Sequence, residues 1–67
     1  MTSTVKRWIE DRGYGFIYNP TAVGKDIFVH HRNIKGTGHK TLREGHRVEF
    51  ETIETAEGFE ALNVRQP

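Results

Sequence analysis

Glycine and proline divide this chain at short intervals, and this spacing is the strongest constraint on its fold. The breaks fall at Gly13, Asn19-Pro20, Gly24, Gly36, Gly38, Gly45 and Gly58. No helix-length stretch remains between them. β-Branched and aromatic residues alternate with other residues in the remaining pieces, a period-two pattern typical of half-buried strands. We expect five strands, over residues 5–10, 14–18, 27–30, 48–54 and 59–64.

No helix is predicted that could cover the edges of a sheet formed by these strands, so the edges must be removed in another way. An exposed sheet edge pairs readily with other chains, and a sheet that closes on itself removes both of its edges. A chain of 67 residues is also too short for two cores without disulfides or metal ions. We therefore expect an all-β fold, a small five-stranded barrel that forms one domain over residues 1–67.

The composition excludes several classes of protein. The chain has no cysteine, which excludes disulfide scaffolds, thiolate zinc sites and cysteine nucleophiles. No apolar run approaches the roughly 20 residues that a membrane helix needs. The N-terminal segment, residues 1–6, lacks the apolar stretch of a signal peptide. We expect a cytoplasmic protein that does not enter a membrane.

Charge is distributed unevenly along the chain, although the formal net charge is only +1. Residues 1–43 carry eight lysines and arginines against three acids, whereas residues 44–67 carry two against six. Such asymmetry is compatible with a polyanion-binding surface, and also with charges that only solvate an exterior. The charge pattern alone leaves both interpretations open.

Alternation assigns the aromatic residues of the second and third expected strands to one face. Ile17, Ile27 and Val29 point to the opposite side of these strands from the rings. The aliphatic side chains form the natural core, which places the rings on the outside, where apolar clusters commonly mark binding sites. This outer set is Tyr14, Phe16, Phe28 and His30.

The first expected strand extends the same outer face. If Val5 and Ile9 point into the core, Lys6 and Trp8 point outward. In the alternative arrangement, the rings fill a second small core beneath a loop. We favour the exposed arrangement because basic residues are interleaved with the rings, and a covering loop would bury their charges.

Rings among cations on a sheet face suit a single-stranded nucleic acid. Each unpaired base offers a face that stacks on a ring, and the phosphates between the bases attract cations. Duplex DNA hides these faces and is read by a helix or ribbon in a groove, for which the sequence has no candidate. The pattern therefore favours single strands over duplex.

Two short motifs carry a family resemblance. Residues Arg12-Gly13-Tyr14-Gly15-Phe16-Ile17 resemble the first ribonucleoprotein motif, and Ile27-Phe28-Val29-His30 resemble the second. Gly13 and Gly15 in the first motif would form a tight turn and a bulge, and would also clear space for a base. The order and spacing of these motifs and of the segments between them resemble the bacterial cold-shock proteins from Val5 to Val64.

The resemblance implies a five-stranded antiparallel OB-type barrel that binds single-stranded DNA and RNA, commonly pyrimidine-rich. It also implies an RNA chaperone that melts RNA secondary structure, and we expect a monomer with no obligate protein partner. By position, the stacking residues would be Trp8, Tyr14, Phe16, Phe28, His30, His31 and His39. Cations and polar groups around them would be Lys6, Arg7, Arg12, Lys40, Asp26 and Glu60.

The chain departs from the family pattern at the margins of this site. Arg7 stands where the family usually has Trp, and Trp8 stands where it has Phe. His31 and His39 both occupy positions where Phe is usual, and these changes bear on base preference. Phe59 stands where Pro is common and would add a ring to one rim of the site.

Other functions have weaker support. The four histidines, His30, His31, His39 and His46, lack the spacing of a metal site, so we expect neither a metal nor another cofactor. Residues 38–41 lack the Gly-Lys-Ser/Thr adjacency of a phosphate-binding loop, and no grouping of Ser, His and acid indicates an enzyme. The remaining alternative is a barrel that binds a peptide on its aromatic face.

Overall fold

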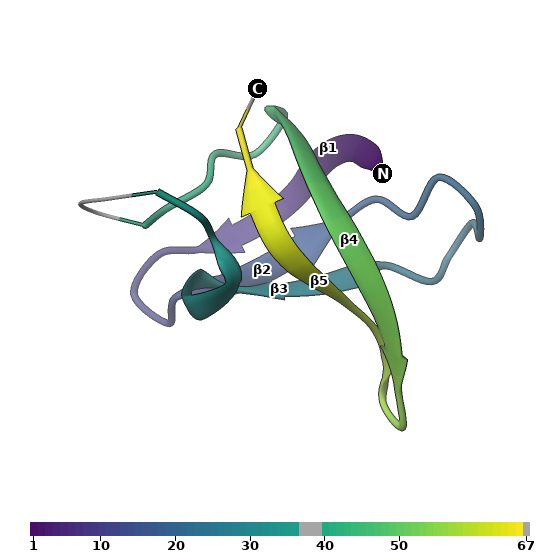
Figure 1. Cartoon of the computed structure of the whole chain (residues 1–67). Coiled ribbons are helices and arrows are strands. Elements are labelled where there is room, and N and C mark those ends of the chain that lie inside the picture. Colours follow the sequence, from purple (N-terminus) through teal and green to yellow (C-terminus); the bar gives the residue numbers. More distant parts are fainter. Residues whose placement is uncertain (37–39, 67) are drawn as a thin grey trace.

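The structure is a computed structural model, and it describes residues 1–36 and 40–66. These residues form five strands and one short helix (Figure 1). The elements are β1 (Thr2–Ile9), β2 (Tyr14–Ile17), β3 (Ile27–His30), the 3-10 helix η1 (His31–Asn33), β4 (Arg47–Thr55) and β5 (Gly58–Arg65). The five strands predicted from the sequence are confirmed, with small shifts at their ends. No helix in the described ranges has the length and apolar character needed to cross a membrane.

The strands close into a barrel in the order β1-β2-β3-β5-β4, and β4 pairs with β1 to complete the ring. The predicted closed, all-β, OB-type barrel is confirmed with one difference in strand direction. β3 and β5 pair in parallel, through Ile27 with Phe59 and Phe28 with Glu60, whereas the other neighbours run antiparallel. Five strands cannot alternate direction all the way around a closed ring, so one neighbouring pair must point the same way.

The barrel interior holds the predicted aliphatic core. Ile17, Ile27 and Val29 are fully buried, whereas the rings that alternate with them on β2 and β3 keep part of their surface in solvent. Burying each aliphatic side chain contributes roughly 1.5–3 kcal/mol to folding. The prediction that the aliphatic residues face inward and the rings outward is therefore confirmed. The rest of the core is Val5, Ile34, Leu42, Val48, Phe50, Ala61 and Val64.

β1 contains a bulge at its centre. Val5 lies opposite Ile17 of β2, but Arg7 lies opposite Phe16. Two steps along β1 therefore correspond to one step along β2, and Lys6 is the extra residue. An extra residue exchanges the two faces of the strand for every residue beyond it.

The prediction that Trp8 points outward and Ile9 inward is wrong for this reason. Trp8 lies opposite Gly15 and packs against the edge of the core. Ile9 lies opposite Tyr14, on the outer side, and is only half-buried. Simple alternation does not reveal the bulge because no glycine or proline marks the position of Lys6.

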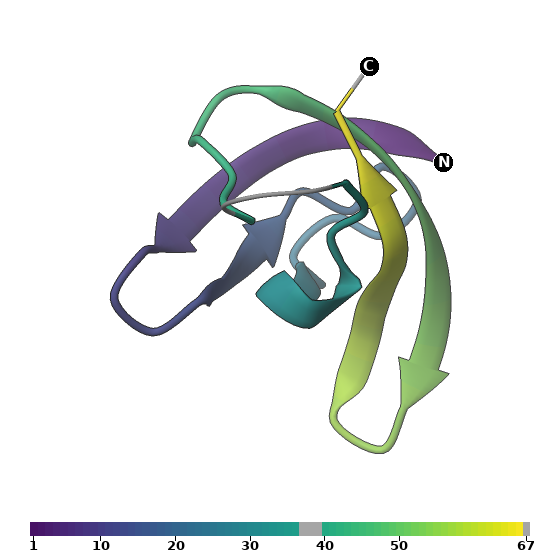
Figure 2. The same cartoon turned by 60° about the vertical axis from the view of Figure 1, so that its left-hand side comes forward.

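β4 and β5 form a long hairpin whose tip extends beyond the other strands (Figure 2). Between Glu49 and Glu51 of β4 the register shifts, and β5 gains one residue there. Asn63 adopts a left-handed conformation in this bulge, with φ of 53°, which asparagine tolerates better than most residues. Glu49, Glu51 and Glu54 are exposed on the solvent side of the hairpin.

Gly15 is a position where β1 and β2 approach too closely for a side chain. A Cβ atom there would lie 2.2 Å from the carbonyl oxygen of Arg7 and 2.8 Å from Cε3 of Trp8. Because backbone must move to relieve this overlap, we expect Gly15→Ala to lower the free energy of unfolding by about 3 kcal/mol. Chemical denaturation measures the loss.

Gly45→Ala is the matched control. Gly45 has a positive φ of 87° but open space around its Cβ position, so its substitution carries backbone strain of about 1–2 kcal/mol without steric overlap. Equal losses in the two variants would contradict the close approach of β1 and β2 at Gly15.

Candidate nucleic-acid interface

Five rings from β2, β3 and η1 follow one another on the outer face of the barrel. Cross-strand pairing places Phe16 beside Phe28 and Tyr14 beside His30. The ring centroids of Phe16 and Phe28 are 5.9 Å apart, those of Tyr14 and Phe28 are 5.6 Å apart, and those of His30 and His31 are 4.4 Å apart. We call Tyr14, Phe16, Phe28, His30 and His31 the aromatic strip.

The two glycines beside Tyr14 make room for the protein's own rings. A Cβ atom at Gly13 would lie 2.5 Å from Cδ2 of His31, and φ at this glycine is 72°. The space beside Gly15 is occupied by Trp8 in the same way. These glycines therefore allow His31 and Trp8, two predicted site residues, to lie close to the backbone of the strands, and the space that they leave is already occupied by protein.

A hollow of about 500 Å³ opens at the His31 end of the aromatic strip. It brings together four predicted site residues, because Trp8, Arg12, His31 and Lys40 all line it. Both Arg12 and Lys40 are exposed, so their charges face solvent at the rim of the hollow. His39, also predicted for the site, lies outside the described residues.

Glu10 is a residue of this hollow that the sequence pattern did not single out. Its Oε1 accepts a hydrogen bond of 2.9 Å from Nε1 of Trp8 and another from the hydroxyl of Thr41. The carboxylate of Glu44 accepts a further hydrogen bond, of 3.1 Å, from the backbone N–H of Trp8. These acids therefore tie the end of β1 to the segment before β4 and orient the indole ring.

Glu60 reaches the aromatic strip through the parallel pairing of β5 with β3, which places it beside Phe28. Its Oε2 accepts a hydrogen bond of 3.2 Å from Nδ2 of Asn33 and lies 3.8 Å from the Arg32 guanidinium. Arg32 and Asn33 were not predicted for the site, and their only signal in the sequence is that they directly follow His30-His31. The structure places Glu60 beside the strip, and its contact with a base stays a prediction.

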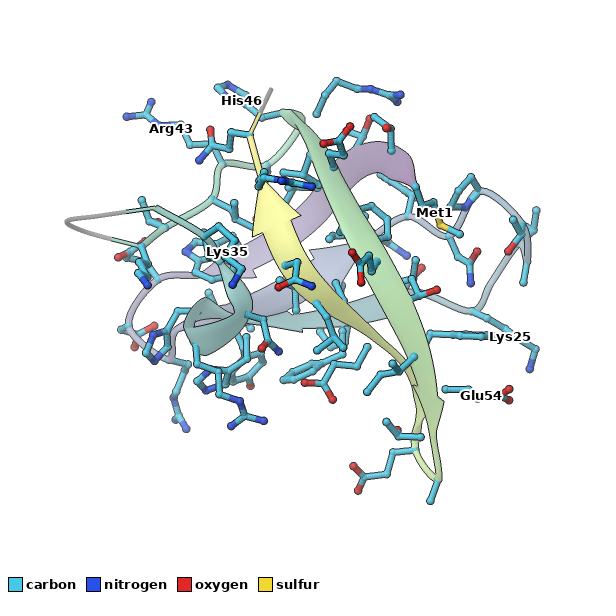
Figure 3. All side chains as sticks on the ribbon, in the orientation of Figure 1. Met1, Lys25, Lys35, Arg43, His46 and Glu54 are labelled. Atoms are coloured by element: carbon cyan, nitrogen blue, oxygen red, sulfur yellow. The ribbon has the colours of Figure 1, made fainter. Side chains whose placement is uncertain are left out.

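Phe59 does not join the aromatic strip. It pairs with the inward-facing Ile27 and packs against the core, so the expectation that it adds a ring to one rim of the site needs correction. It lines a separate hollow near the hairpin tip, together with Lys25 and Glu54. Both of these side chains extend from the same end of the barrel in Figure 3. The parallel register of β3 and β5 decides this placement.

Lys6 and Asp26, both predicted for the site, pair with each other. Nζ of Lys6 donates a hydrogen bond of 2.8 Å to Oδ2 of Asp26. The hydrogen bond and the negative charge of Asp26 raise the pKa of Lys6 above its ordinary value. Arg7, which lies opposite Phe16, is exposed and adds a second cation beside the rings.

His30 joins the aromatic strip to η1. Its Nδ1 accepts a hydrogen bond of 3.2 Å from the backbone N–H of Arg32, a contact that requires the unprotonated nitrogen. Burial, together with the nearby His31 and Arg32, lowers the pKa of His30, and Glu60 acts in the opposite direction. Within residues 1–36 and 40–66, no group of three or more His, Asp or Glu side chains is placed to hold a metal ion.

Comparison with known proteins agrees with this architecture. A family model described as the 'Cold-shock' DNA-binding domain matches residues 1–67. The chain belongs to this cold-shock domain family. The family resemblance predicted from the two motifs is therefore confirmed, and with it a role in nucleic-acid binding.

Individual relatives are similar to this cold-shock domain over most of its length. Cold shock-like protein CspA of Shewanella violacea is 46% identical over 63 residues, which are 94% of this chain and 89% of that protein. The major cold shock protein of Micrococcus luteus is 48% identical over 61 residues, 91% of this chain and 90% of its own. Cold shock-like protein CspE of Buchnera aphidicola is 50% identical over 60 residues, 90% of this chain and 86% of its own.

The lowered pKa of His30 predicts a pH dependence of stability. A histidine whose pKa is lower in the folded chain than its ordinary value of about 6.5 binds protons more readily when unfolded. Folding stability therefore decreases as the pH falls below about 6.5. We expect the wild-type melting temperature to drop more between about pH 7.5 and pH 5 than that of His30→Gln, which has no imidazole to protonate. Parallel melting profiles would show that His30 does not contribute.

Proposed function

We propose that this cold-shock domain binds single-stranded DNA and RNA through the aromatic strip and the cations around it. The observation that carries the proposal is the placement of Tyr14, Phe16 and Phe28 on the outer face of β2 and β3, with centroids 5.6–6.5 Å apart. If these three rings packed the core, they would point inward with Ile17 and Ile27. They point outward instead. Each outward ring offers a surface on which one base can stack.

The polar surroundings support a nucleic acid over an uncharged ligand. Arg7, Arg12 and Lys40 are exposed around the strip and the hollow beside it, where phosphates between stacked bases would lie. Asp26 and Glu60 supply carboxylate oxygens that accept hydrogen bonds from base edges. All fourteen predicted site residues except Phe59 remain in the proposed site, and His39 remains as a prediction from the resemblance alone.

We further propose that binding keeps RNA unstructured, so that the domain acts as an RNA chaperone and influences transcription or translation. A protein that stacks unpaired bases stabilises the single strand relative to the hairpin by mass action. Pyrimidine-rich strands are the ligands that the family resemblance implies. The monomeric state and the cytoplasmic location of the protein stay predictions.

Removing single rings from the strip tests the site. We expect Phe16→Ala and Phe28→Ala each to weaken the binding of a thymidine oligonucleotide by roughly 5- to 150-fold, because one stacked base contributes ~1–3 kcal/mol. Fluorescence titration measures the affinity, and far-ultraviolet circular dichroism checks the fold. Val23→Ala, in a fully exposed loop residue, is the control and should bind like wild type. Unchanged affinity in both ring variants would contradict the site.

Salt separates nucleic-acid binding from the peptide-binding alternative. Each phosphate contact on a single strand lowers log K by ~0.7 for each tenfold increase in salt, whereas peptide docking on rings responds little. Quenching of Trp8 fluorescence, in the hollow beside the strip, follows the titration. We expect affinity for oligo-dT to fall steeply with salt and expect little quenching by duplex DNA. Salt-independent affinity, or equal binding of duplex, would favour a different ligand.

A further inference from the structure

Tyr18 is the most exposed of the phenylalanine, tyrosine and tryptophan residues that the structure describes. Tyr18 is 51% exposed, whereas Tyr14, Phe16 and Phe28 of the aromatic strip are half-buried. It directly follows β2, on the same outer face as Phe16 two residues earlier. The ring therefore continues the line of the strip toward the opposite end from His31.

The backbone of Tyr18 is held in place independently of its ring. Its N–H donates a hydrogen bond of 3.0 Å to the carbonyl oxygen of Thr4, and its own carbonyl accepts one of 2.7 Å from the hydroxyl of Ser3. These bonds extend the β1–β2 ladder by one residue beyond Ile17. The ring thus has a fixed attachment point and does not belong to the core cluster.

Cations flank the exposed ring. The bulge in β1 turns Lys6 toward Tyr18, and Nζ of Lys6 lies 5.5 Å from the ring centroid. Lys6, Arg7 and Tyr18 line one open groove, whose lining also includes the acids Glu10, Asp11 and Glu44. Lys6, the cation beside the ring, is also paired with Asp26. The combination of an exposed ring and adjacent cations is the one that accommodates a base and its phosphate.

We propose that Tyr18 is an additional base-stacking position, which lengthens the nucleic-acid site by one nucleotide beyond Phe16. Lys6 and Arg7 contact the phosphate of that nucleotide, and the phenol ring stacks on its base. Any base fits, because stacking on a ring requires only the face of the base. The inference rests on the proposed function, since it extends the same single-strand site.

A length series of oligonucleotides tests this position. Thymidine oligonucleotides of increasing length are titrated against wild type, Tyr18→Ala and Tyr18→Phe at one salt concentration. Short oligonucleotides should bind wild type and Tyr18→Ala equally, because they do not reach beyond Phe16. Above one particular length, wild-type affinity should exceed that of Tyr18→Ala by roughly 5- to 150-fold. Tyr18→Phe should match wild type at every length, because it keeps the ring.

Two further variants test whether any change in affinity comes from the loss of the ring rather than from a change in the strand or the loop. Tyr18→Thr removes the ring but keeps a β-branched side chain at the end of the strand, and it should reproduce the result of Tyr18→Ala. Val23→Ala removes exposed apolar surface from the neighbouring loop and should follow wild type at every length. Thermal unfolding of each variant confirms that the barrel is intact.

The outcomes distinguish this inference from the proposed function. If wild type binds single strands, but the ring-removing variants follow it at all lengths or weaken binding equally at all lengths, the additional position is overturned. If wild type binds no single strand of any length, the proposed function fails, and this inference fails with it. A deficit confined to the longer oligonucleotides supports the additional stacking position.

Discussion

The register between β2 and β3 is the constraint on which the rest of this molecule depends. It sets Ile17 against Ile27 inside the barrel and Phe16 against Phe28 outside it. Because side chains alternate along a strand, a slip of one residue would move the rings into the core and the aliphatic residues into solvent. The same pairing therefore creates the hydrophobic core and the aromatic strip, and neither can form without the other.

Closing five strands into a ring adds a second condition, which shapes the edge of the interface. One neighbouring pair must run parallel, and the pair is β3 with β5. This contact brings Glu60 to Phe28 and turns Phe59 toward the core. The polar residues of η1 then meet the Glu60 carboxylate, which gives the strip an ordered border of hydrogen-bonding groups beside the rings.

The bulge at Lys6 explains how β1 contributes side chains both to the core and to the outer surface. Before it, Val5 faces the core; beyond it, Arg7 faces outward beside Phe16 while Trp8 packs over Gly15. A regular strand would place Lys6 and Trp8 together on one face. The bulge instead supplies two consecutive cations to the outer surface and packs the indole ring against the edge of the core.

The residue order alone is enough to predict the number of strands, the aliphatic core of β2 and β3, the outward rings and the family. The strands, the core and the outward rings follow from local properties, because glycine spacing and period-two alternation lie in neighbouring residues. The family follows from the resemblance of two short motifs and the segments between them. The faces of Trp8 and Ile9, the position of Phe59, and the hydrogen bonds of Glu10 with Trp8 and of Asn33 with Glu60 emerge only when the strands pair. Each of these depends on which residue lies across from another in a distant strand, and an unmarked bulge or a parallel pairing changes that partner without changing the local pattern.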